Sequence, residues 1–179
     1  MPNLEFLERK PLVDPSAFIA PSADLIGDVT IGAQSSIWYR CVLRADINRI
    51  RIGNRSNIQD GSVLHLADEF GVEIGDEVTV GHQALIHACT IEDGVLVGMG
   101  AVIMDGATIG EGSIVGAGSL VLAESQIPPG SLVIGSPAKV VRQLGDDEKG
   151  EGRRLAEKYV LVSRRYLALR SDLDADPGV

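Results

Sequence analysis

Three histidines in a short stretch of the chain are the residues whose type and spacing point most directly to chemistry. They are His65, His82 and His87, and the sequence holds no other histidine. A neutral imidazole nitrogen binds divalent metal ions such as zinc, with bond lengths of roughly 2.0–2.1 Å. The three side chains therefore suggest a metal site, provided that the fold brings them together.

Aliphatic residues recur every six positions through most of the chain. An amphipathic helix would give steps of three and four, and a half-buried strand would give steps of two. A period of six instead predicts a β-helix of hexapeptide repeats, with about eighteen residues in each triangular coil. The repeated positions are Val13, Ile19, Leu25, Ile31, Ile37 and Leu43, then Ile52, Ile58 and Leu64, then Ile74, Val80 and Ile86, and last Ile91, Val97, Ile103, Ile109, Val115, Val121, Ile127 and Val133.

The alignment of successive coils places two of the histidines above one another. His65 directly follows the inward residue of its repeat, Leu64. His87 follows Ile86 in the same way, on the same third side of the next coil. Neighbouring strands lie about 4.8 Å apart, so the two imidazoles should stack closely enough to share one metal ion.

His82 is placed differently, because it lies two residues past Val80 on the second side of its coil. A side of six residues extends toward about 20 Å, which is too far for His82 to join His65 and His87 of its own chain. A neighbouring subunit can supply it, and three subunits around an axis would form three equivalent sites. The spacing thus predicts a homotrimer with a metal ion at each subunit interface.

Polar residues near the histidines in the coil alignment extend the candidate site. Arg44 continues the column of His65 and His87 one coil earlier, and Asp46 can hold its guanidinium by paired hydrogen bonds. An ordinary surface or interface ion pair between Arg44 and Asp46 is an equally good reading. The second side adds three candidates around the position beneath His82, namely Asn57, Gln59 and Asp60.

The chain divides into four expected parts. An N-terminal arm over 1–12 precedes the β-helix over 13–142, and a turn at 135–139 is expected to end the coils. A C-terminal helix is expected over 143–170 and a disordered tail over 171–179. The phase of the repeat breaks near 46–50, 66–71 and 88–90, where irregular segments are expected. The apolar stripe that predicts the helix consists of Leu155, Tyr159, Val162, Tyr166 and Leu169.

Charge and hydropathy limit the partners. The formal net charge of -9 and the lack of a basic stripe argue against nucleic acid or an anionic membrane as partner. The N-terminal residues lack the pattern of a signal peptide, and no apolar run is long enough to span a bilayer. We therefore expect a cytoplasmic protein that acts on a small molecule, with Cys41 and Cys89 as reduced, buried thiols.

The motifs around the histidines resemble those of the γ-class carbonic anhydrases. The resemblance implies a left-handed β-helix, a trimer, and zinc, or iron or cobalt, bound across each interface by His65 and His87 of one subunit and His82 of the next. The activity it implies is the hydration of carbon dioxide to bicarbonate. The matching motifs are Arg44-Ala45-Asp46, Asn57-Ile58-Gln59-Asp60-Gly61, His65, Gly81-His82 and His87.

The same resemblance assigns roles to the surrounding residues. Gln59 is similar to a glutamine beside the metal-bound water, and Arg44 and Asp46 are similar to an intersubunit ion pair. Asn57 and Asp60 match polar residues near the site. Tyr159 matches a tyrosine that reaches the pocket, although a role in the helix core is equally compatible with its position.

The chain departs from the best-known members in one segment. They carry a long acidic loop with a proton-shuttling glutamate between the first two histidines, whereas this chain has only residues 66–71 there. Asp68 or Glu69 is the candidate shuttle, and the alternative is that both are solvated loop charges. The resemblance to short-loop relatives implies weak or conditional activity.

Two other functions remain open on the sequence. Residues 135–142 resemble the exit turn of hexapeptide acyltransferases, which use a histidine as general base, and a metal-assisted acyl-coenzyme A thioesterase belongs with this alternative. A non-enzymatic trimer stabilised by metal would use the same three ligands. The metal itself is not decided, because imidazole suits zinc, iron and cobalt alike.

Overall fold

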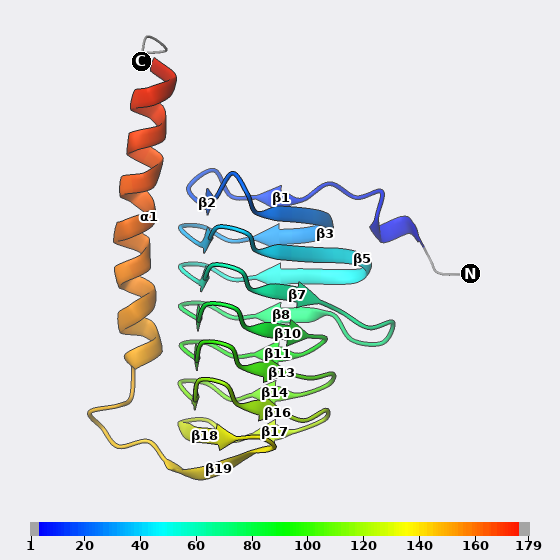
Figure 1. Ribbon diagram of the computed structural model, residues 1–179, viewed down its shortest axis with the longest axis vertical. Coiled ribbons are helices and arrows are strands. Elements are labelled where there is room, and N and C mark those ends of the chain that lie inside the picture. Colours follow the sequence, from blue (N-terminus) through cyan, green and yellow to red (C-terminus); the bar gives the residue numbers. More distant parts are fainter. Residues whose placement is uncertain (1–3, 176–179) are drawn as a thin grey trace.

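The computed structural model describes residues 4–175, and it is an all-β fold with a C-terminal helix (Figure 1). Its short strands wind into a left-handed parallel β-helix, and the helix runs along one side of the stack. A short 3-10 helix, η1 (Leu4–Phe6), precedes the first strand. The elements are β1 Leu12–Val13, β2 Phe18–Ile19, β3 Asp24–Ile31, β4 Ser36–Ile37, β5 Val42–Ile52, β6 Asn57–Ile58, β7 Val63–His65, β8 Val72–Ile74, β9 Thr79–Val80, β10 Leu85–His87, β11 Thr90–Ile91, β12 Leu96–Val97, β13 Val102–Ile103, β14 Thr108–Ile109, β15 Ile114–Val115, β16 Leu120–Val121, β17 Gln126–Ile127, β18 Ser131–Gly135, β19 Ala138–Gln143 and α1 Glu151–Ala175.

Parallel pairing between successive coils creates three sides. The second side is one sheet, in which β2, β4, β6, β9, β12, β15 and β18 lie in order and β19 closes the end. The other sheet bends around a corner, with β7, β10, β13 and β16 on the third side and β8, β11, β14 and β17 on the first. The long strand β5 belongs to both of these sides. The register sets Leu64 beside Ile86 and Ile58 beside Val80, as the six-residue alignment predicts.

The repeated aliphatic residues form the core, which confirms the interpretation of the period. From Ile31 to Val121 every repeated position is buried, with exposed fractions between 0% and 4%. Burying each such side chain contributes about 1.5–3 kcal/mol, so the column of aliphatic residues is the main source of stability. Val13 is exposed and Ile127 only partly buried, because fewer coils cover them at the two ends of the stack.

One phase break differs from the irregular segment expected at 46–50. Strand β5 runs through it without interruption, and β3 pairs with it on both sides of a register shift between Gly27 and Val29. The additional residues form a paired ribbon that overhangs the coils (Figure 1). Pairing satisfies backbone hydrogen bonds that an irregular loop would leave to water. The other two breaks are a loop between β7 and β8 and a tight corner at Ala88, whose φ is 49°.

The chain leaves the coils through the antiparallel hairpin of β18 and β19. Helix α1 begins only at Glu151, later than expected, because Gly150 has a φ of 88° and the preceding residues form a turn. In that turn the backbone N–H of Gly145 donates to Glu148 Oε2 at 3.0 Å. Residues 171–175, expected to belong to a disordered tail, continue the helix, since the first helix breaker is Pro177. Residues 176–179 of that expected tail lie outside the described residues, and β1 begins at Leu12, within the expected arm.

Helix α1 packs against the second side through small residues together with part of the predicted apolar stripe, since Tyr159 and Val162 pack against the buried Phe18 and Trp38. Tyr166 and Leu169 of that stripe are exposed. A Cβ on Gly152 would lie 2.2 Å from the carbonyl oxygen of Gly94, so only glycine permits this approach of helix and coil. Small side chains thus bring the start of the helix close to the coil. Among helix residues 151–169, the buried ones are Gly152, Ala156, Val160 and Ser163.

Neither cysteine in the described part of the chain forms a disulfide, and both Cys41 and Cys89 are buried, as the sequence predicts. Burial raises the pKa of Cys41 to about 11 and that of Cys89 to about 12. Within residues 4–175, no helix is both long enough and apolar enough to cross a membrane.

Candidate metal centre

The third side brings two of the histidines together, as the coil alignment predicts. His65 ends β7 and His87 ends β10, and the parallel register pairs the two residues directly. Their ring centroids are 5.2 Å apart, and Nδ1 of His65 faces Nε2 of His87 at 3.1 Å. Two nitrogens bound to one tetrahedral ion at 2.0–2.1 Å would lie about 3.3 Å apart. The separation of the two imidazoles therefore fits a shared divalent metal ion.

A carboxylate contacts the second nitrogen of each of these imidazoles. Asp46 Oδ1 lies 3.3 Å from His65 Nε2, and Asp105 Oδ1 lies 2.5 Å from His87 Nδ1. Histidines that bind metals commonly donate their second ring N–H to a carboxylate, which fixes the ring and leaves the other nitrogen for the metal. Both rings thus have the surroundings of metal ligands.

Asp105 is a residue that the sequence motifs miss. It lies two residues past Ile103, and Ile103 pairs with Ile86 in the register of β13 and β10. The coil alignment that stacks His65 and His87 therefore contains a signal for Asp105, since it places that residue beside His87 in the next coil. The signal is weak in the sequence because an acidic residue at a corner of the coil is usually solvated.

Arg44 and Asp46 form an ion pair within one chain, beneath His65. Burial tends to raise the pKa of Asp46, but the hydrogen bond and the charge of Arg44 outweigh it and lower that pKa. Burial, followed by the charge of Arg44, lowers the pKa of His65. His65 is therefore neutral at pH 7 and has a lone pair available for a metal ion.

His82 lies in the same coil as His87 but at a different corner, the one that follows β9. Its Nδ1 is 2.9 Å from Asp60 Oδ2, and its side chain is 42% exposed. No group of three or more His, Cys, Asp or Glu side chains in the described residues is arranged to hold a metal ion within one chain. The third histidine thus stands apart from the His65–His87 pair, as the alignment predicts.

Gln59 and Asn57 belong to a buried hydrogen-bond network that runs from β6 to the helix. Gln59 Nε2 donates to Asn57 Oδ1 at 3.1 Å, and Asn57 Nδ2 donates to Thr79 Oγ1 at 2.9 Å. Thr79 Oγ1 in turn donates to the carbonyl oxygen of Gly152 at 3.2 Å. Asn57 therefore contacts Gln59 directly and is connected to the start of α1 through Thr79, and its side chain orients the Gln59 amide.

Tyr159 connects the helix to the corner that carries Asp60. Its ring packs edge-on against Trp38, with centroids 5.4 Å apart, in a cluster with Phe18 and Tyr166. Burial, and then the negative charge of Asp60, raises the pKa of Tyr159. Tyr159 thus combines a packing role with a place near Asp60, and both of its expected roles are compatible with the structure.

The short loop at 66–71 carries both candidate proton shuttles on its exposed face. Asn48 Nδ2 donates to the carbonyl oxygens of Ala67 and Asp68, at 3.2 Å each, and so holds the loop against the overhanging ribbon. Glu69 lines a pocket of about 310 Å³ together with Asn48 and Cys89, and none of the histidines lines that pocket. The structure therefore does not bring Asp68 or Glu69 into contact with the histidine pair.

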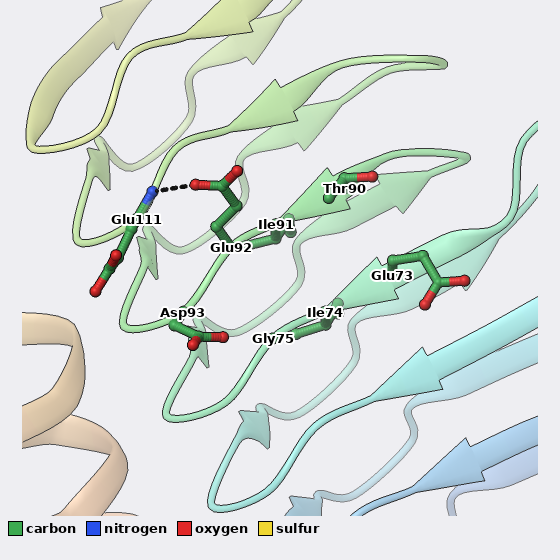
Figure 2. A pocket seen from close by; sticks show the side chains of 8 residues that line it. All are labelled: Glu73, Ile74, Gly75, Thr90, Ile91, Glu92, Asp93 and Glu111. Atoms are coloured by element: carbon green, nitrogen blue, oxygen red, sulfur yellow. Dashed lines mark hydrogen bonds between the residues drawn. The ribbon is translucent and has the colours of Figure 1, made fainter.

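A second pocket, of about 370 Å³, lies on the first side of the coils and contains no histidine (Figure 2). Four carboxylates line it, and each of them has a partner that holds it in place, Glu111 through an ion pair with Arg153. Glu92 accepts the backbone N–H of Glu111, Asp93 accepts that of Asp76, and Glu73 pairs with Arg49. These contacts stabilise the corners of the coils, and this pocket is separate from the candidate metal centre.

The repeated coils define a hexapeptide-repeat protein, and residues 88–123 match the family described as bacterial transferase hexapeptide (six repeats). A "Probable carbonic anhydrase" of Methanocaldococcus jannaschii is 54% identical over 152 residues, which cover 85% of this chain and 96% of the relative. "Gamma carbonic anhydrase 2, mitochondrial" of Arabidopsis thaliana is 46% identical over 174 residues and 94% of this chain. A solved hexapeptide transferase family protein from Anaplasma phagocytophilum is 44% identical, with a TM-score of 0.84 over 87% of this chain and 92% of that one.

The chain belongs to the γ carbonic anhydrase family. It spans 63% and 62% of the length of the two Arabidopsis relatives that it matches over more than nine tenths of its own length. Membership in the family implies a metal cofactor, and the His65–His87 pair is the part of this chain that fits one.

Proposed function

We propose that this chain is a metal-dependent carbonic anhydrase that interconverts carbon dioxide and bicarbonate. The observation that carries the proposal is the 3.1 Å separation of the His65 and His87 ring nitrogens, each ring also contacting a carboxylate. Such a preorganised pair leaves room for further ligands on the ion, and an open coordination position distinguishes a catalytic site from a structural one. Zinc is the proposed metal, with iron(II) or cobalt(II) as alternatives that imidazole ligands also suit.

We also propose that three chains assemble so that His82 of one completes the His65–His87 pair of another. Apolar side chains are exposed on the surfaces that would meet in such a trimer. Val63 and Leu85 lie outward on β7 and β10, next to the histidine pair, and Met99 is 59% exposed in the coil that follows His82. Covering these residues with another subunit would bury apolar surface, which favours association. Three such interfaces close a ring with three equivalent sites.

The chain's own residues account for the remaining steps of the proposed reaction. When bound, a divalent ion with an open position supplies a hydroxide nucleophile from water near neutral pH. Gln59 Nε2 donates to Asn57 Oδ1, and this hydrogen bond holds the Gln59 amide. The side-chain oxygen of Gln59 is then left to accept a hydrogen bond from the attacking hydroxide or water and to orient it. The ion pair of Arg44 and Asp46 fixes the ring of His65. In the overall reaction, carbon dioxide and water combine to give bicarbonate and one proton. Asp68 or Glu69, exposed on the loop that follows β7, is the proposed acceptor of that proton, which reaches it through solvent because neither side chain contacts the histidine pair.

The test is stopped-flow hydration of carbon dioxide by protein loaded anaerobically with zinc and, separately, with iron(II). Turnover that depends on the metal and disappears in His87→Ala supports the proposal and identifies the metal that sustains it. Absence of turnover at full metal occupancy would overturn the carbonic anhydrase proposal while leaving the metal centre in place. Sedimentation of the same samples tests the trimer, and a monomeric holoprotein would contradict the shared site. The cytoplasmic location stays a proposal, which fractionation of the source cells tests.

Acyl transfer is the second candidate, favoured by one observation. The solved relative from Anaplasma phagocytophilum, 44% identical over most of this chain, is named as a hexapeptide transferase family protein. Binding of coenzyme A to the metal-loaded chain, measured by calorimetry, tests this alternative and the thioesterase variant of it.

A further inference from the structure

We infer that Asp105 is a positioning residue that fixes His87 as a metal ligand and strengthens its bond to the ion. The inference rests on the proposed metal centre and adds a residue that the family motifs in the sequence do not include. It concerns the affinity and the geometry of metal binding, and it is therefore testable apart from catalysis.

The contact between the two side chains fixes the protonation pattern of the imidazole. Asp105 Oδ1 lies 2.5 Å from His87 Nδ1, within reach of a hydrogen bond from the imidazole N–H to the carboxylate. A neutral imidazole has one N–H, and this contact holds it on Nδ1. The lone pair is then on Nε2, which is the nitrogen that faces His65 at 3.1 Å.

Hydrogen bonds from both neighbouring coils hold the backbone that carries the Asp105 carboxylate. The carbonyl oxygen of Asp105 accepts the N–H of Glu124 at 2.8 Å. The next N–H along the chain, that of Gly106, donates to the carbonyl oxygen of Ala88 at 2.7 Å. Since Ala88 directly follows His87, the donor and the acceptor of the His87–Asp105 hydrogen bond are attached to backbone segments that are themselves hydrogen-bonded to each other.

Asp105 differs from Asp46, the carboxylate behind the other histidine of the pair. Asp46 divides its charge between His65 and Arg44. In the described part of the chain, Asp105 has an ion pair with His87 alone. Because its charge is not shared, the Asp105 carboxylate attracts the Nδ1 proton of His87 more strongly than Asp46 attracts the proton of His65. This attraction makes His87 Nε2 a better electron donor to a cation. The geometry therefore assigns the stronger influence on metal binding to Asp105.

The experiment compares the wild-type chain with Asp105→Asn and Asp105→Ala, using zinc and cobalt(II) as probes. Asp93→Asn is the matched control, because Asp93 is also a coil-corner carboxylate but accepts the backbone N–H of Asp76 and contacts no histidine. Zinc affinity is measured by competition with a chromophoric chelator. Cobalt(II) absorption reports the geometry of the ligands, and the paramagnetically shifted N–H signal of His87 reports its protection by Asp105. Thermal unfolding of the metal-free proteins measures any structural damage separately.

We expect zinc affinity to fall about tenfold to a hundredfold in Asp105→Asn and at least as far in Asp105→Ala, with Asp93→Asn unchanged. The cobalt(II) spectrum should shift, and the N–H signal should exchange rapidly with solvent in Asp105→Ala. Wild-type affinity and an unchanged cobalt(II) spectrum in both Asp105 variants would overturn the inference while leaving the metal centre intact. Failure of the wild-type protein to bind zinc or cobalt(II) would overturn the metal centre and this inference together, whereas metal binding without turnover affects only the proposed reaction.

Discussion

His65 Nδ1 and His87 Nε2 lie 3.1 Å apart across two neighbouring coils, on residues that the parallel register pairs directly. The β-helix creates this relationship without any contribution from a loop, because both histidines are the last residues of their strands. A slip of one residue in the register would turn one imidazole toward the aliphatic core. The stacked core therefore determines the geometry of the metal centre as well as the stability of the fold.

Replacing His82 should release the metal even though each chain keeps the His65–His87 pair. Zinc bound by four ligands has an apparent binding free energy of about 10–16 kcal/mol, so one ligand contributes on the order of 3 kcal/mol, or about a hundredfold in affinity. We expect His82→Ala to lose most of its metal on dialysis, measured as metal per chain by mass spectrometry. Lys158→Ala, on the exposed face of α1, is the control. Stoichiometric, tightly held metal in His82→Ala would refute the shared site.

Replacing Gln59 should lower turnover without releasing the metal. The side chain is buried and its amide is held by Asn57, so Gln59→Ala removes an orienting group and leaves Asn57 Oδ1 without this donor. An unsatisfied buried acceptor costs about 1–3 kcal/mol of stability. We expect a reduced kcat at unchanged metal content, together with a lower Tm. A variant with wild-type kcat at full metal occupancy would remove Gln59 from the proposed mechanism.

The sequence predicts the core and the histidine pair because the same six-residue period determines both. Once Leu64 and Ile86 occupy equivalent inward positions, the stacking of His65 on His87 follows. Other features depend on contacts between distant segments, which the period does not contain. The close approach of the helix to the coil at Gly152 and the burial of Ala156 are examples, since neither residue belongs to the apolar stripe. The same alignment places Asp105 beside His87, but nothing in the sequence distinguishes it from an ordinary solvated carboxylate at a corner of the coil.

The two cysteines should resist alkylation in the folded protein. Burial raises the pKa of Cys41 to about 11 and that of Cys89 to about 12, so at pH 8 both groups are almost entirely in the unreactive thiol form. We expect negligible reaction with iodoacetamide over hours at pH 8, followed by mass spectrometry, and rapid labelling of both in denaturant. Fast labelling of Cys89 in the native state would show that the corner at 88–90 opens readily.

Asp28 should make stability depend on pH through its pairing with two arginines. Arg9 Nη1 and Arg51 Nη1 lie 2.6 Å and 2.8 Å from its carboxylate oxygens. Burial tends to raise the pKa of Asp28, but the hydrogen bonds and charges of Arg51 and Arg9 outweigh it and lower that pKa. The stabilisation is therefore present above the ordinary carboxyl pKa and is lost as the pH falls through the lowered value. Asp28→Asn should have a lower Tm than wild type at pH 7, and this difference in Tm should shrink under strongly acidic conditions. The control is Asp24→Asn, at an exposed carboxylate, which should have the Tm of the wild type at both pH values. An equal deficit at all pH values would indicate a packing effect instead.

Gly81 should be indispensable at the position before His82, for a steric reason that a second glycine of the same type can test. Gly81 and Gly116 each follow the inward residue of a repeat on the second side. A Cβ on Gly81 would lie 2.7 Å from the backbone nitrogen of Met99, which cannot move without disturbing the next coil.

On Gly116 the nearest atom to an added Cβ is Cγ1 of Ile134, at 3.3 Å, and that exposed side chain can give way. We expect Gly81→Ala to cost about 1–3 kcal/mol of stability and Gly116→Ala to cost clearly less, as measured by urea unfolding of the metal-free proteins. Gly81→Ala should also weaken metal binding, because the displaced backbone carries His82. Equal stability losses in the two variants would mean that the backbone at Met99 moves as easily as the exposed side chain of Ile134. The close packing of one coil on the next would then not be what fixes the position of His82.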